Sequence, residues 1–181
     1  MRFILVRHGT TDWNEQNRIQ GHTNNNLNDQ GFEDAKETAK KLMGLGITKI
    51  ISSPLNRAVQ TTIMIYLKLK VDVSLNNGLE ECSFGAVEGL TLPEARKQFR
   101  GILTHETLYS CKHYDYRPVG GEDSVSVMKR FIQVLEDCRQ KFTEDDIVLI
   151  VAHGWLFCTM LTALGNDNPM MQRGEYRIIE Y

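Results

Sequence analysis

The sequence predicts an α/β domain built around a mostly parallel sheet and extending over all 181 residues. Short apolar runs, typical of strands buried on both faces, alternate with segments in which apolar residues recur at helical spacing. This alternation is the pattern of a parallel sheet covered by helices. The length suffices for one sizeable core, and the hydrophobic fraction of 41% is ordinary for a soluble globular protein. We therefore expect a single domain, residues 1–181.

Five segments are predicted to be strands. The runs at residues 3–6, 50–51 and 147–151 are wholly apolar, which fits strands covered on both faces. Residues 71–73 form a weaker candidate. Residues 176–181 alternate loosely between apolar and polar side chains and are consistent with a terminal strand.

Four segments are predicted to be helices, at residues 32–43, 55–66, 128–142 and 155–164. The third has the clearest apolar stripe, and the fourth is apolar nearly all round, which predicts a buried helix. Residues 101–121 lack periodicity and are interpreted as a long loop over one end of the sheet, the usual place for a lid. Its Tyr109 and Tyr114 either stack on a substrate ring or pin the loop to the core.

Composition excludes several classes of partner. A formal net charge of -2 provides no general basic field for nucleic acid or an anionic membrane. The longest apolar run, residues 147–152, is far shorter than a membrane span. The four cysteines are widely spaced, with no CxxC pair, and no secretory leader is visible. We expect a reduced, soluble, cytoplasmic protein without a metal site or cofactor.

Polar residues follow the predicted strands in an unusual way. Arg7, His8 and Gly9 come directly after the first strand, and His153 and Gly154 follow the long apolar run at residues 147–151. Singly, each has an ordinary explanation as a surface charge, a cap or a satisfied core group. Ligands of parallel α/β sheets, however, bind beyond the carboxyl ends of the strands. The repeated His-Gly therefore predicts a shared site at one end of the sheet.

Two further charged positions join this prediction. Arg57 follows the second strand at the start of a helix, and Glu80 and Glu81 lie in a glycine-containing loop after another strand. Guanidinium groups match phosphate oxygens, a neutral imidazole can attack phosphorus, and a carboxylic acid can protonate a leaving oxygen. This set suits phosphoryl transfer without a metal. Neither an HExxH helix nor a GxxxxGK[ST] loop is present, which argues against a zinc hydrolase and a P-loop enzyme.

The chain also resembles a known family, the histidine phosphatases, the superfamily that contains cofactor-dependent phosphoglycerate mutase. Six blocks carry the resemblance in order along the sequence. They are RHGT at residues 7–10 with Trp13-Asn14, RIQG at 18–21, SSPLNRAVQT at 52–61, LEECSFGAVEG at 79–89, PVGGE at 118–122, and VAHG at 151–154. The resemblance implies a three-layer α/β/α sandwich with a mixed, mostly parallel sheet.

The resemblance implies a role for each matching residue. His8 would be the nucleophile that becomes phosphohistidine, and Glu81, not Glu80, fits the position of the proton donor. The other implied contacts to the phosphoryl group or substrate come from Arg7, Asn14, Gln20, Gly21, Arg57, His153 and Gly154. The chain departs from the family pattern at His22 to Leu27 and at Trp155, on the substrate side of the pocket.

Three functions remain open from the sequence. The first is a metal-independent phosphomonoesterase acting on a small phosphorylated substrate. The second is mutase-type transfer between positions of a small phosphorylated acid, which such a short chain disfavours because mutases of this family are typically longer. The third is a non-catalytic phosphate-binding module, disfavoured because a nucleophile and an acid are both present. Arg96, Lys97 and Arg100 either bind a second anionic group or form a solvated helix face. The sequence does not indicate an oligomeric state.

Overall fold

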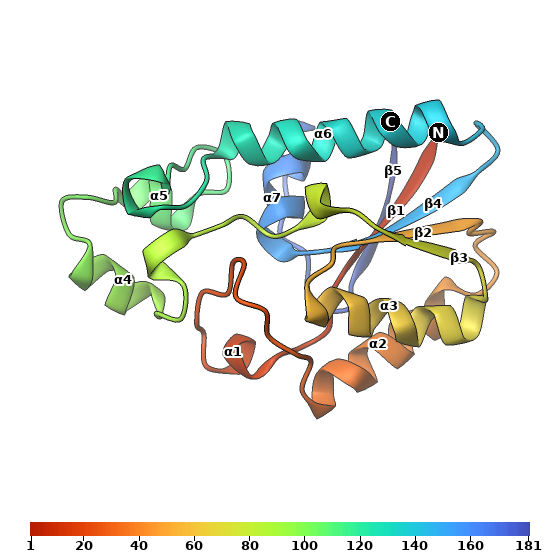
Figure 1. The fold of residues 1–181 in the computed structure, drawn as a ribbon, viewed down its shortest axis with the longest axis horizontal. Coiled ribbons are helices and arrows are strands. Elements are labelled where there is room, and N and C mark those ends of the chain that lie inside the picture. The colour runs from red at the N-terminus through yellow and green to blue at the C-terminus, as the bar shows by residue number, and fades with distance from the viewer.

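A five-stranded mixed sheet forms the centre of the computed structural model, which describes residues 1–181 (Figure 1). The strands are β1 (Arg2–Arg7), β2 (Lys49–Ser52), β3 (Asp72–Leu75), β4 (Ile147–Ala152) and β5 (Tyr176–Glu180). They lie in the order β3-β2-β4-β1-β5. β1, β2, β3 and β4 run parallel, and β5 pairs antiparallel with β1. The predicted α/β class with a mostly parallel sheet is confirmed.

Successive side chains of the central strands point to opposite sides of the sheet. Because the side chains on both sides are apolar, helices cover both faces. Phe3 and Leu5 of β1 enter the core beneath α6 (Ser124–Lys141) and α7 (Gly154–Ala163). Ile4 and Val6 enter the opposite core, beneath α2 (Asp29–Leu42) and α3 (Asn56–Leu69). Figure 1 shows the two helical layers on either side of the strands. This double burial explains why β1 and β4 read as unbroken apolar runs.

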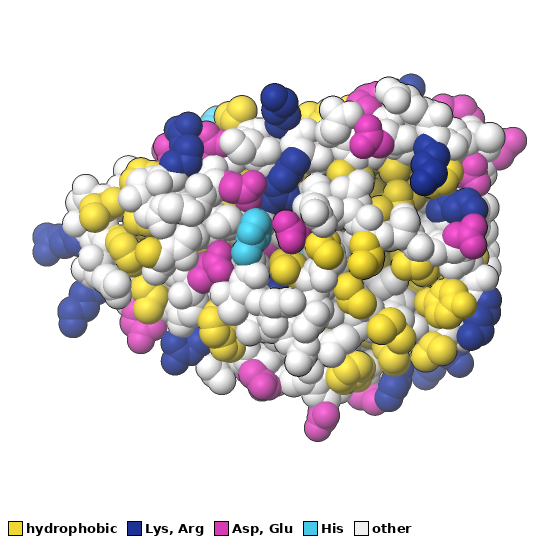
Figure 2. Space-filling model, viewed as in Figure 1, with side chains coloured by type: hydrophobic (Ala, Val, Ile, Leu, Met, Phe, Trp, Pro, Cys, Tyr) yellow, Lys and Arg dark blue, Asp and Glu magenta, His cyan; other side chains and the backbone are white.

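The edge strand β3 differs from the central strands, because all four of its residues are exposed. With the neighbouring α3 it contributes apolar side chains to the surface, at Ile63, Leu67, Val73 and Leu75. Hydrophobic side chains are concentrated over this part of the molecule in Figure 2. The apolar pattern at residues 71–73 is weak because neither face of this strand is covered by a helix.

The shorter elements gather beyond the carboxyl ends of the parallel strands. They are α1 (Asp12–Glu15), α4 (Leu92–Gln98), α5 (His105–Tyr109) and three 3₁₀ turns (Asn77–Leu79, Gly85–Val87 and Arg117–Val119). The expectation of a loop without helix at residues 101–121 is wrong in part. α5 begins at an N-cap, Thr104, whose side chain accepts a hydrogen bond from the Thr107 N–H. Five residues are too few to show helical periodicity in the sequence.

Two of the four cysteines are paired, which corrects the expectation that all are reduced. Cys111 in the 101–121 segment forms a disulfide with Cys158 in α7, 47 residues away, while Cys82 and Cys138 are free and buried. The bridge fastens the segment to the helix that follows His153. None of the helices is long and apolar enough to cross a membrane.

Candidate active site

His8 lies just past the end of β1 and is almost completely buried. Its Nδ1 is 2.7 Å from the carbonyl oxygen of Gly9, to which it donates a hydrogen bond when that nitrogen carries the proton. This bond fixes the ring and leaves Nε2 as the unprotonated nitrogen, available to the cavity that His8 lines. An imidazole held in this tautomer is suited to act as a nucleophile.

Close backbone approach explains the glycine that follows each histidine. A Cβ on Gly9 would come within 2.3 Å of the Gly31 carbonyl oxygen. A Cβ on Gly154 would lie 2.7 Å from Cζ of Arg7. The absence of a side chain at residue 154 thus lets the Arg7 guanidinium pack against the start of α7.

Two arginines flank His8, of which Arg57 is fully buried and Arg7 partly buried. Nη1 of Arg7 donates to the Met171 carbonyl, and Arg57 donates to the carbonyls of Gly21 and Thr23 through Nη2 and Nη1. In both residues Nε has no hydrogen-bond partner within the chain. Buried N–H donors are nearly always satisfied, so two unsatisfied guanidinium nitrogens beside one histidine favour an anionic ligand.

His153 closes the inner end of the site as the N-cap residue of α7. Its ring lies 5.2 Å from that of His8, and its Nε2 is 2.7 Å from Oγ of Ser53. Ser53 Oγ accepts the Leu55 N–H and can donate its own hydrogen to His153. In that arrangement His153 Nδ1, which has no partner in the chain, is protonated and can donate to a phosphoryl oxygen.

The charge states follow from burial. Burial lowers the pKa of His8 well below its usual range, and the positive charges of Arg57 and Arg7 lower it further. Burial and the same arginines, with His8, also lower the pKa of His153. Burial lowers the pKa of Arg57 to about 10, so this guanidinium remains charged at neutral pH. The site therefore combines two neutral imidazoles with two cations.

Glu81 supplies the carboxyl group of the site and is bound by three backbone N–H groups. Its Oε1 accepts from Leu156 at 2.7 Å and from Cys82 at 3.0 Å, and Oε2 accepts from Trp155 at 3.0 Å. Two of these donors belong to the first turn of α7, where the helix dipole favours a negative charge. Glu81 lines the same cavity as Arg7, His8 and Arg57. Oε1 therefore accepts from two donors and Oε2 from one.

The remaining predicted residues lie at the rim. Asn14, Gln20, Gly21 and Gly154 line the cavity. Asn14 and Thr11 form a capping box at α1, and the Thr11 hydroxyl donates to Gln20 Oε1. Gly21 has φ +54, and its carbonyl accepts from Arg57. Each predicted site residue thus lines this cavity or, for His153, lies directly behind it.

Known proteins are similar to this chain in sequence and fold. The model of the histidine phosphatase superfamily (branch 1) matches residues 3–177. The chain belongs to the histidine phosphatase superfamily. It is 32% identical to a probable phosphoglycerate mutase, GpmB, of Proteus mirabilis, over 91% of this chain and 75% of the relative. The corresponding Escherichia coli protein is 33% identical, over 91% of this chain and 75% of the relative.

Solved structures of similar fold include phosphatases. A mycobacterial glucosyl-3-phosphoglycerate phosphatase in complex with VO3 has a TM-score of 0.86 and 26% identity, covering 99% of this chain and 92% of the other. Bacillus stearothermophilus YhfR has a TM-score of 0.82 and 26% identity, covering 99% of this chain and 90% of the other. The predicted family is confirmed.

Sequence reasoning missed the residue that holds the loop carrying Glu81, residues 78–83, called the acid loop below. Arg130 of α6 donates to the carbonyls of Gly78, Glu80 and Glu81 at 2.6–2.8 Å. It also forms a two-point ion pair with Glu122 at 3.0 and 3.1 Å. Glu122 in turn accepts the Ser83 N–H. In the sequence Arg130 looks like an ordinary helix charge, and nothing in its spacing points to carbonyls about 50 residues away.

The cavity has a volume of about 420 Å³, and the residues that line it beyond those already described are mainly apolar. Its walls comprise Ile19, Phe84, Leu92, Leu108, Tyr116, Trp155 and Met170, with Arg18 and Arg173 as further cations. Sequence reasoning missed Arg173. Trp155 lines the pocket, so it narrows the substrate side instead of belonging wholly to the core.

The tyrosines of the 101–121 segment have different roles. Tyr114 is buried with its hydroxyl 3.1 Å from that of Thr159, so it pins the segment to α7. Tyr109 is exposed and lies outside the cavity, which Tyr116 lines instead. Of the two roles expected for these tyrosines, Tyr114 pins the segment to the core, and the tyrosine placed to contact a substrate in the cavity is Tyr116.

The other histidines do not form a ligand cluster. His22 is half-exposed, with Nε2 2.8 Å from the carbonyl oxygen of Glu81. His105 stacks on Tyr109. No group of three or more His, Cys, Asp or Glu side chains is placed to hold a metal ion.

Proposed function

We propose that this protein is a metal-independent phosphomonoesterase that acts through a phosphohistidine on His8. One observation carries the proposal. The His8 ring is fixed through Nδ1, between two arginines whose Nε donors lack partners, in a cavity that also contains Glu81. The family and its phosphatase neighbours support the same general reaction.

In the first step, Nε2 of His8 attacks the phosphorus of a monoester. The P–Nε2 bond forms while the bond from phosphorus to the leaving oxygen breaks. Arg7 and Arg57 neutralise the equatorial oxygens, and His153 donates from Nδ1. A proton on Glu81 Oε2 passes to the leaving oxygen, so the alcohol departs neutral.

In the second step, water attacks the phosphohistidine. Glu81, now ionised, accepts a proton from that water while the P–Nε2 bond breaks. Inorganic phosphate leaves and His8 returns to the neutral state that its buried position favours. The same carboxyl group therefore acts first as acid and then as base.

A mutase is the second candidate, supported by the names of the curated relatives. Transfer between positions of a phosphorylated acid requires cations for the acid group, which Arg18 and Arg173 at the cavity would provide. The apolar walls favour the phosphatase, because a small polar acid would contact few of them. Conversion of 3-phosphoglycerate to its 2-isomer, measured beside phosphate release, separates the two candidates.

A non-catalytic phosphate-binding module is the third candidate and is less favoured. Binding alone requires the arginines, but it does not require a nucleophilic nitrogen with a carboxyl group in the same cavity.

A cytoplasmic location also remains part of the proposal. The Cys111–Cys158 disulfide argues against it, since such bonds are rare in reducing compartments.

The test is phosphate release from an aryl phosphomonoester in excess chelator, with wild type, His8→Ala and Glu81→Gln. We expect chelator-resistant turnover that disappears in His8→Ala. Glu80→Gln is the matched control for the acid, because Glu80 precedes it and does not line the cavity. Turnover that is lost with chelator, or retained in His8→Ala, would overturn the proposal.

A further inference from the structure

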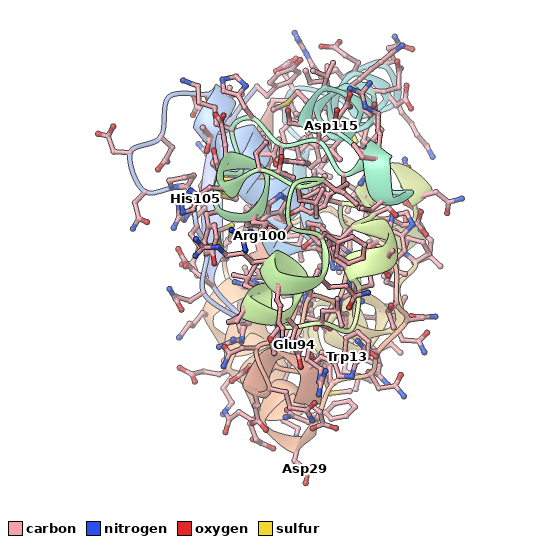
Figure 3. The ribbon with its side chains drawn as sticks, turned by 90° about the vertical axis from the view of Figure 1, so that its left-hand side faces the viewer. Trp13, Asp29, Glu94, Arg100, His105 and Asp115 are labelled. Carbon is pink, nitrogen blue, oxygen red and sulfur yellow. A yellow bond between two sulfur atoms is a disulfide. The ribbon has the colours of Figure 1, made fainter.

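A second concave site lies on the cap formed by α4, α5 and their connection. This cap cleft has a volume of about 670 Å³. Its lining is basic and is contributed by Arg96, Lys97, Arg100 and His105, with Tyr109 beside them. In Figure 3 the labelled Arg100 and His105 lie close together on the face turned toward the viewer. In Figure 2 basic side chains project from the same end of the molecule.

The cations of the cap cleft have no partners of their own. The side chains of Arg96, Lys97 and Arg100 form neither an ion pair nor a hydrogen bond within the chain, although they line one hollow. Some surface lysines elsewhere pair with carboxylates, as in Lys36–Glu33 and Lys41–Glu37, and others such as Lys129 do not. The cap cleft differs because three unpaired cations line one hollow. Three uncompensated positive charges in a concave surface attract anions.

The local helix does not account for the whole cluster. A cation near the C-terminus of α4 is favoured by the helix dipole, which explains Arg96 and Lys97. Arg100 and His105, however, lie beyond the end of that helix. Glu94, the acidic residue of α4, binds the N–H and hydroxyl of Thr91 at the opposite end of the helix and does not line the cleft.

The cap cleft adjoins the cavity of His8. Leu108 lines both, and Leu92 of the cavity is followed in the chain by Pro93 of the cleft. Leu92 and Leu108, where the two hollows meet, are apolar, and Leu108 is buried. One ligand can therefore contact both only if an apolar chain joins two anionic ends.

We propose that the cap cleft binds the far end of the substrate, and that this substrate is a phosphomonoester with a second anionic group. The inference rests on the proposed function at His8. The second group, a phosphate or a carboxylate, is carried on an apolar chain long enough to pass Leu108. Compact phosphorylated acids, with their two charges only a few bonds apart, are too short for this binding mode.

The experiment is calorimetric binding of non-hydrolysable alkyl phosphonates of one chain length that end in methyl, carboxylate or phosphonate. With wild type we expect the anionic ends to improve affinity about tenfold, the effect of a few exposed ion pairs. In Arg96→Gln/Arg100→Gln this advantage should vanish, while affinity for the methyl-ended ligand is unchanged. Lys40→Gln/Lys68→Gln removes the same charge from α2 and α3 and should retain the advantage.

The outcomes separate the two proposals. Equal affinity for methyl and anionic ends in wild type would overturn the cap-cleft inference and leave the phosphatase intact, as would an advantage that persists in Arg96→Gln/Arg100→Gln. Failure of every phosphonate to bind would overturn the phosphoryl site and the inference with it. A preference for only one of the two anionic ends would identify the second group.

Discussion

Arg130 is predicted to position the general acid without contacting the substrate. Arg130→Met removes three hydrogen bonds to carbonyls of the acid loop and the ion pair with Glu122. Breaking a buried ion pair costs about 3–5 kcal/mol. Because the Arg130 side chain is 20% exposed, water replaces part of this loss, and we expect destabilisation of about 3 kcal/mol.

The effect on activity should depend on the leaving group. General acid catalysis contributes about 10²–10⁴-fold, and a loosened Glu81 loses part of it. We expect kcat/KM to fall about 10–100-fold for an alkyl phosphate, whose leaving oxygen needs a proton. A 4-nitrophenyl phosphate needs little protonation and should lose about threefold or less.

The assay measures both substrates and urea unfolding of each variant at a temperature where all are folded. Lys129→Met is the matched control, because Lys129 is the neighbouring residue of α6, is exposed and has no partner. It should change neither stability nor the ratio of the two rates. Equal losses on both substrates in Arg130→Met would refute the positioning role and leave Arg130 as a structural residue only.

Three other predictions concern buried groups of the site and the cap. The pKa values of His8 and His153 are lowered in the folded state, so below about pH 6.5 the unfolded chain binds more protons than the folded one. The free energy of unfolding should therefore fall as the pH falls, by up to about 1.4 kcal/mol per pH unit for each histidine. Urea titrations at several pH values should show a shallower acid slope in His153→Asn. Reduction of the Cys111–Cys158 disulfide should lower the free energy of unfolding by about 4 kcal/mol, as expected for cysteines 47 residues apart. A thiol assay on the denatured chain should find two free thiols before reduction and four after it. Four free thiols before reduction would contradict the bridge. Gly154→Ala should displace the Arg7 guanidinium and lower kcat/KM about 100-fold with the fold intact by circular dichroism, and unchanged kinetics would contradict the close packing.

The features that could be predicted from the sequence are those whose position in the fold produces a local pattern of residues. The apolar runs of β1 and β4 are visible because both of their faces are buried, and His8 and His153 are visible because each follows such a run. The topology then brings the two rings within 5.2 Å, as expected for the carboxyl ends of neighbouring parallel strands.

Other features depend on contacts that leave no local pattern. Arg130 acts on carbonyls of a distant loop, and its own helix gives no sign of this. Cys111 and Cys158 are joined across a long separation without a recognisable motif. In each case, the partner rather than the residue type determines the role.

Covalent trapping would show directly whether the phosphoryl group is carried by His8. The wild-type protein would be mixed with an excess of an aryl phosphomonoester, quenched in alkali within one turnover and examined by peptide mass spectrometry. We expect one phosphoryl group, labile to acid, on the peptide that contains His8, and none in His8→Ala. Rapid turnover without a phosphoryl group on His8, or with one on another residue, would contradict this expectation.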